Sequence, residues 1–165
     1  QEICFVPDNN YAGLIERQTP DEVKNGTIVD RNGQIVGEHG GHQHFTIGQR
    51  RGLNVSLGHP IYVIDKNPQT NTVTVGLKEQ TLGRGLLADQ TNWLVDPPGD
   101  QPIPCLIKIR SNSPAVPGRV RTTGQDSLSV SFDESQPAVT PGQAVVCYDG
   151  ERLLGGGWIC RALPT

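Results

Sequence analysis

The second half of this chain is a series of short β-favouring runs separated by turn sequences at regular intervals. Gly- and Pro-containing turns at 97–100, 124–126, 140–142 and 149–150 mark the ends of these runs. Regular short strands with tight turns are typical of a closed β-barrel or a sandwich, and residues 81–165 suffice for a six-stranded barrel. The candidate strands are Leu86–Leu94, Pro104–Arg110, Gly118–Thr122, Ser127–Phe132, Ala144–Tyr148 and Arg152–Arg161.

The first half of the chain favours a smaller, sheet-rich unit built from two hairpins. Thr27–Asp30 and Gln34–Gly37 flank an Asn-Gly turn, which is the strongest short-range hairpin signal. Pro60–Lys66 and Thr72–Leu77 flank a second turn-forming segment. A short helix is expected over Tyr11–Arg17, because Asp8 or Asn9 can cap it.

The change from two hairpins in the first half to regularly spaced short strands in the second predicts a domain junction near residues 79–84. We expect Gly83-Arg84-Gly85 to act as a short linker there. The 20 glycines and 13 prolines fit a turn-rich β protein. A net charge of −3 gives no global attraction to nucleic acid or to an anionic membrane, and no apolar run reaches the ~18 residues of a membrane helix.

The start of the chain indicates an excised C-terminal piece of a larger protein. The sequence contains no Met and opens with an apolar run, Gln1–Val6. A processed secreted domain that has lost its signal peptide is the alternative.

The four cysteines favour reduced thiols in a cytoplasmic protein. They are widely spaced and form no C-x-x-C pair, which argues against a structural zinc site. Cys105, Cys147 and Cys160 lie in strand-like apolar runs and are expected to be buried. Cys4 instead precedes a helix start, where the pKa of a thiol can fall, so it is either a reactive cysteine or a buried structural one.

A local cluster of basic residues stands out in this acidic chain. Lys108, Arg110, Arg119 and Arg121 lie in the window 103–123, which has no acidic residue. In each pair the two side chains point to one face of a strand, so the two strands side by side would suit a phosphate backbone. An ordinary solvent-facing sheet is the alternative.

The segment 38–53 is rich in Gly, His and Arg. Gly48 and Gly52 bracket a turn that would present Arg50 and Arg51, whose guanidinium groups suit phosphate oxygens. Three histidines also raise a metal hypothesis, but few further ligands lie near them. We expect His39, His42 and His44 to make structural hydrogen bonds, and we expect no metal site.

Four segments together resemble the C-terminal half of a tRNA-specific 2-thiouridylase. They are Gln1–Val6, the Glu38–Leu53 stretch that ends in Thr-Ile-Gly-Gln-Arg-Arg-Gly-Leu, the Thr-Pro-Gly-Gln segment Ala138–Ala144, and Leu154–Ile159. They occur in the family's order and spacing over nearly the whole chain. An older name for such proteins is methyltransferase, but the sequence has no Gly-rich S-adenosylmethionine site.

The resemblance implies a three-part protein. Residues 1–18 would be the tail of a missing N-terminal ATP-binding catalytic domain, residues 19–80 a central domain, and residues 81–165 a C-terminal barrel resembling a translation-factor barrel. The family's phosphate loop, Ser-Gly-Gly-x-Asp-Ser, is absent from this sequence. ATP with Mg is therefore expected in the parent's missing domain, and no cofactor is expected in this fragment, which should be inactive alone.

The resemblance also implies an activity and its residues. The family adenylates the C2 oxygen of the wobble uridine of tRNA and replaces it with sulfur from a cysteine persulfide, which by resemblance is carried by Cys4. A sulfur-relay donor protein would load it. Arg110-Ser111 and Gln143 match the family's tRNA contacts, although Ser111 replaces an expected aromatic residue. The alternative function is a non-catalytic RNA-binding β-barrel module.

Overall fold

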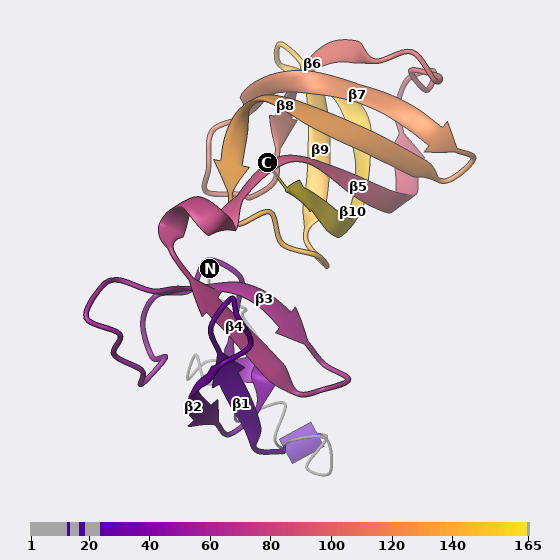
Figure 1. Cartoon of the computed structure of the whole chain (residues 1–165). Coiled ribbons are helices and arrows are strands. Elements are labelled where there is room, and N and C mark those ends of the chain that lie inside the picture. Colours follow the sequence, from indigo (N-terminus) through magenta and orange to yellow (C-terminus); the bar gives the residue numbers. More distant parts are fainter. Residues whose placement is uncertain (1–12, 14–16, 19–23, 165) are drawn as a thin grey trace. The chain divides into compact units, whose positions relative to one another are not determined.

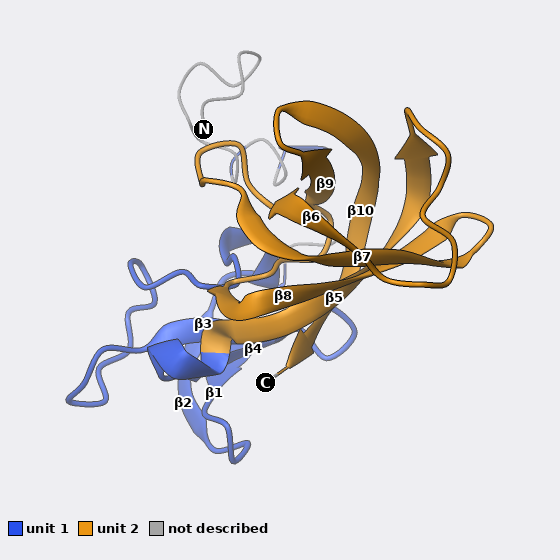
Figure 2. Cartoon of the chain, turned by 90° about the horizontal axis from the view of Figure 1, so that it is seen from above, with its two compact units in different colours: residues 1–80 blue, residues 81–165 orange. Residues whose placement is uncertain are grey.

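The computed structural model describes residue 13, residues 17–18 and residues 24–164. The chain is mainly β and forms two compact units, residues 1–80 and residues 81–165 (Figures 1 and 2). Cys4 and most of the helix expected over Tyr11–Arg17 lie outside the described residues.

The first unit contains a four-stranded mixed sheet in the order β2-β1-β4-β3. Strands β1 and β2 form one antiparallel hairpin, β3 and β4 form the other, and β1 runs parallel to β4. Both predicted hairpins are thus confirmed. The strands are β1 (Gly26–Val29), β2 (Ile35–His39), β3 (Tyr62–Asn67) and β4 (Thr72–Gly76).

Side chains on one face of this sheet and from the segment after β2 form a small core. Ile28, Val63 and Val73 are fully buried on the sheet. Phe45 and Leu53 come from the connection between β2 and β3, which includes a short 3-10 helix, η2 (His42–His44), and they belong to the same cluster. The connection is therefore packed onto the sheet.

The second unit is a closed six-stranded barrel in the order β10-β5-β8-β7-β6-β9, with β9 pairing back onto β10. Every pairing is antiparallel. The predicted barrel is confirmed, and several strands are longer than the sequence indicated. They are β5 (Leu82–Trp93), β6 (Ile103–Lys108), β7 (Val116–Gly124), β8 (Ser127–Pro137), β9 (Ala144–Asp149) and β10 (Arg152–Pro164).

Alternation along the strands separates the barrel core from its outer surface. In β8, Leu128 and Val130 are fully buried, while Ser129 and Ser131 lie on the opposite face. Side chains alternate between the two faces of a strand, so every second residue is committed to the core. The polar residues between them are thereby fixed on the outside, where a partner can reach them.

The expected linker at Gly83-Arg84-Gly85 is wrong. These residues belong to β5, and a 3-10 helix, η3 (Lys78–Thr81), precedes them. A Cβ atom on Gly85 would lie 2.3 Å from the carbonyl oxygen of Val130 in β8. Glycine is needed at position 85 because the backbone of β8 comes very close to it. A Gly-x-Gly pattern that serves such close strand packing looks the same in the sequence as a flexible linker.

Candidate nucleic-acid interface

Two of the described cysteines form a thiol pair inside the barrel. Cys147 is fully buried and Cys105 nearly so. The hydrogen bond between the two thiols, together with burial, raises the pKa of the Cys147 thiol above its ordinary value. Cys147 is therefore held as an inaccessible thiol rather than as a nucleophile.

The prediction that Cys160 is buried is wrong. Cys160 is exposed, because it follows the buried Ile159 and successive side chains of a strand point to opposite faces. A hydrogen bond from its thiol to Asp89 raises the pKa of Cys160. An exposed but protonated thiol is a weak nucleophile at neutral pH.

The turn that carries Arg50 and Arg51 is held in place by Gln49. The Gln49 side-chain oxygen accepts a hydrogen bond from the Thr46 backbone N–H at 2.9 Å, and its amide nitrogen donates to the Arg51 carbonyl at 2.9 Å. The Gln49 backbone also accepts a bond from the Val63 N–H at 2.9 Å. Both arginines are exposed, so a fixed turn presents them to solvent.

Replacing Gln49 with alanine is expected to destabilise the first unit by about 1–2 kcal/mol, because two backbone groups lose their side-chain partner. Gln49→Glu should recover part of this loss, since a carboxylate can still accept from Thr46 but cannot donate to Arg51. Urea unfolding of the two variants measures the effect. Equal stability of wild type and Gln49→Ala would contradict the bracing role.

Two histidines of segment 38–53, His39 and His42, make the expected structural hydrogen bonds. His39 is buried, and its Nδ1 accepts a bond from the Gly41 N–H at 3.0 Å. Nδ1 of His42 lies 3.1 Å from Oδ1 of Asn71. Burial lowers the pKa of His39, which favours its neutral form. Within the described residues, no cluster of His, Cys, Asp and Glu side chains could hold a metal ion.

The structure brings Arg110 to the segment that contains Gln143. The Arg110 guanidinium donates a hydrogen bond to the carbonyl of Ala138 at 2.5 Å, and the Thr140 hydroxyl donates to the same oxygen at 2.9 Å. Gln143 is exposed, and its carbonyl accepts from the Ile159 N–H at 2.8 Å. The hydrogen bond from Arg110 thus holds the start of the Ala138–Ala144 segment in place. Ser111, the residue after Arg110, is exposed.

The two predicted basic strands, β6 and β7, are neighbours, but their cations are not all close together. Pro104 of β6 pairs with Arg119 of β7. Lys108 lies four residues further along β6, which places it about 13 Å along the ladder from Arg119. Lys108 therefore lies near the Arg110 end of the hairpin, and Arg119 and Arg121 lie toward the other end.

A further arginine that the sequence analysis missed lies in line with Arg121. Arg121 pairs with Ser129, Ser129 pairs with Leu87, and Leu87 pairs with Arg161 of β10. The next outer row joins Arg119 to Ser131 and Gly85. We call the outward-facing polar residues of these two rows the basic band. It consists of Arg119, Arg121, Ser129, Ser131 and Arg161.

The basic band crosses four neighbouring strands, of which β7, β8 and β5 run side by side in Figure 2. Arg121 and Arg161 lie three strand spacings apart, about 14 Å. No acidic residue occupies the paired positions of the two rows. Arg121 and Arg161 lie 40 positions apart in the chain, and they are aligned by the register of the strand pairings across the barrel.

Two family models match the sequence. One is described as a tRNA methyl transferase PRC-barrel domain and matches residues 14–77. The other is described as an aminomethyltransferase beta-barrel domain and matches residues 83–159. Together the two matches cover most of both compact units.

Curated relatives extend the match to nearly the whole chain. A protein named tRNA-specific 2-thiouridylase MnmA from Halothermothrix orenii is 43% identical over 159 residues, 96% of this chain. Proteins of the same name from Paramagnetospirillum magneticum and Rhodopirellula baltica are each 45% identical, over 97% and 99% of the chain. This chain belongs to the tRNA-specific 2-thiouridylase family. It spans 42–44% of the length of these relatives.

Membership of the 2-thiouridylase family confirms the resemblance drawn from the four sequence segments. It leaves the roles of Cys4, Arg110, Ser111 and Gln143 as predictions, because a family match does not assign a role to a residue. The geometry adds that Arg110 and Gln143 share one end of the barrel, and that Arg161 extends the row of Arg121.

Proposed function

We propose that this chain is the C-terminal part of an enzyme that replaces the C2 oxygen of the wobble uridine of tRNA with sulfur. The observation that supports this most is the 43–45% identity, over 96–99% of the chain, to proteins named tRNA-specific 2-thiouridylase. The fragment would supply the persulfide cysteine and part of the tRNA-binding surface.

The proposed chemistry divides between this chain and the remainder of the enzyme. In the missing domain the C2 oxygen would attack the α-phosphate of ATP, held with Mg, and release pyrophosphate, so that this oxygen becomes part of an AMP leaving group. The terminal sulfur of a Cys4 persulfide then attacks C2, and AMP leaves with that oxygen. A second cysteine, which by the family resemblance lies in the missing domain, then attacks the sulfur of Cys4, which breaks the bond to the transferred sulfur and forms a disulfide with Cys4. A thiol reductant would then open this disulfide, and a sulfur-relay donor protein would transfer persulfide sulfur to Cys4 again.

The described part of the chain would hold the tRNA rather than react with it. Its three cysteines are either buried or held protonated, so none competes with Cys4 as a nucleophile. Arginine side chains suit phosphate oxygens, and phosphate contacts position a nucleic acid without reading its bases. The proposed tRNA contacts are Arg50, Arg51, Lys108, Arg110, Ser111, Arg119, Arg121 and Gln143.

We place the enzyme in the cytoplasm, where free thiols persist and tRNA is available. The thiol pair inside the barrel and the exposed Cys160 are all free cysteines. In the described part of the chain, no helix has the length and apolar character needed to cross a bilayer.

Replacing Arg121 with alanine is expected to weaken tRNA binding and to lower the slope of log affinity against log salt by about one, because one phosphate contact is lost. Fluorescence anisotropy with labelled tRNA at several salt concentrations measures both changes. Arg152→Ala is the matched control, since Arg152 carries the same charge in the β9–β10 hairpin outside the basic band. Identical slopes for the two variants would contradict a role for the band.

A further inference from the structure

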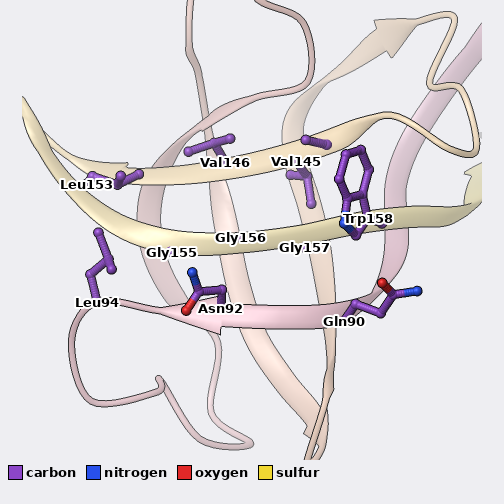
Figure 3. Close-up of a pocket in the computed structure, with 11 residues that line it drawn as sticks. Gln90, Asn92, Leu94, Val145, Val146, Leu153, Gly155, Gly156, Gly157 and Trp158 are labelled. Carbon is purple, nitrogen blue, oxygen red and sulfur yellow. The ribbon is translucent and has the colours of Figure 1, made fainter.

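The outer surface of the barrel has a hollow of about 270 Å³ where β5, β9 and β10 lie side by side (Figure 3). Its floor is the backbone of Gly155-Gly156-Gly157, which has no side chains to fill it. A Cβ atom on Gly156 would lie 2.1 Å from the carbonyl oxygen of Val145. Close strand packing therefore requires glycine here, and the same residues keep the hollow open.

The rim of the hollow combines an aromatic ring with amide groups. Trp158 is 50% exposed, a large fraction for an indole side chain, and it stands at one end. Gln90 and Asn92 project from the β5 side (Figure 3). The exposed side chains of Leu94 and Leu153 close the opposite end.

This chemistry matches an unstacked nucleobase. Bases that leave a helix stack on aromatic side chains and form hydrogen bonds through their edges. An indole offers the flat apolar face, and each side-chain amide offers both a donor and an acceptor to a base edge. Gln90 also has a φ of +48°, a backbone conformation that is uncommon for residues other than glycine.

One residue of the basic band, Arg161, lies next to the hollow on strand β10. Trp158 and Arg161 are three residues apart in β10, so their Cα atoms are at most about 10 Å apart. Both residues are exposed. Asp89 pairs with Trp158 and lies beside the Arg161 row, so a phosphate would be repelled there and attracted toward Arg161. A cationic track beside an aromatic platform is the arrangement that binds single-stranded nucleic acid.

We propose that the hollow beside Trp158 is a binding site for one unpaired nucleobase of RNA, with Arg161 and Arg121 holding the phosphates next to it. This proposal rests on the proposed function, in which the substrate is a tRNA with unpaired loop nucleotides. It assigns roles to Trp158, Gln90, Asn92 and Arg161 that the sequence patterns did not indicate.

The test is titration of the full 165-residue chain with a single-stranded uridine hexamer and with an RNA duplex of equal length. The hexamer should quench the fluorescence of Trp158, while Trp93, whose indole Nε1 is buried, serves as an internal reference. Trp158→Ala should weaken hexamer binding about tenfold and duplex binding little, because stacking of one base is lost. Trp158→Phe should lose less.

Two further variants separate the base site from the phosphate contacts. Arg161→Ala should weaken hexamer and duplex binding alike, and Asp89→Asn should strengthen both. Unquenched Trp158 and unchanged hexamer binding by Trp158→Ala would overturn the base site. If tRNA still binds the chain in that case, the proposed function stands.

Two other results would also overturn the base site. If the unaltered chain binds neither the hexamer nor tRNA, the base site and the proposed tRNA surface of this chain both fail. If Trp158→Ala changes only self-association in sedimentation, the hollow is a protein contact instead.

Discussion

Cys4→Ser should abolish 2-thiouridine formation while ATP-dependent activation of the tRNA continues, because a serine oxygen cannot carry the transferable sulfur of a persulfide. The assay requires a protein that joins this chain to the proposed ATP-binding domain. Mass spectrometry of tRNA nucleosides measures the product, and release of AMP or trapping of the adenylated tRNA measures activation. Retained 2-thiouridine would refute the role of Cys4.

Cys160→Ser is the matched control for this experiment. Cys160 is exposed like a reactive thiol, but its hydrogen bond to Asp89 raises its pKa and the proposed chemistry does not use it. Its replacement should leave thiolation intact. If both variants lose activity equally, a general sensitivity to loss of a thiol explains the result better than a persulfide at Cys4. If neither loses activity, the non-catalytic RNA-binding module becomes the better description of the chain.

Gly85→Ala is expected to destabilise the barrel by about 2–3 kcal/mol. The new Cβ atom would meet the Val130 carbonyl oxygen at 2.3 Å, and a paired backbone cannot move aside without breaking the β5–β8 ladder. Denaturant unfolding followed by tryptophan emission reports on this unit, because Trp93 and Trp158 both belong to the barrel.

Arg84→Ala provides the comparison for Gly85→Ala at the neighbouring position. Arg84 is exposed, and its truncation should change the unfolding free energy by no more than about 0.5 kcal/mol. A flexible linker at 83–85 would tolerate both substitutions equally. Equal stability of the two variants would therefore show that the close approach of β5 and β8 is not required.

Much of the fold could be predicted from the sequence because turn chemistry is local. The Asn32-Gly33 turn has a φ of +82° at Gly33, which glycine adopts easily, and Asp30 accepts hydrogen bonds from the backbone of Asn32 and Gln34. Such signals need only a few neighbouring residues. They located the two hairpins and the six barrel strands.

The remaining features depend on contacts between segments that are distant in the sequence. Gly85 resembles a linker residue until the closeness of β8 is known. Cys160 lies in an apolar run, but the neighbouring Ile159 takes the inward-facing position and leaves Cys160 on the outer face. The alignment of Arg121 with Arg161 requires three successive pairings among four strands. No sequence periodicity encodes such a register, so these parts of the candidate site required the structure.

The closed ring of strands has a consequence for synthesis on the ribosome. β10 is the last of the six barrel strands in the order of synthesis, and it pairs with both β5 and β9. Until it emerges, those two strands have unpaired edges, which are templates for association with other nascent chains. The barrel therefore cannot close before residues 152–164 have been synthesised. Release of the polypeptide before that point would leave an aggregation-prone intermediate that requires a chaperone.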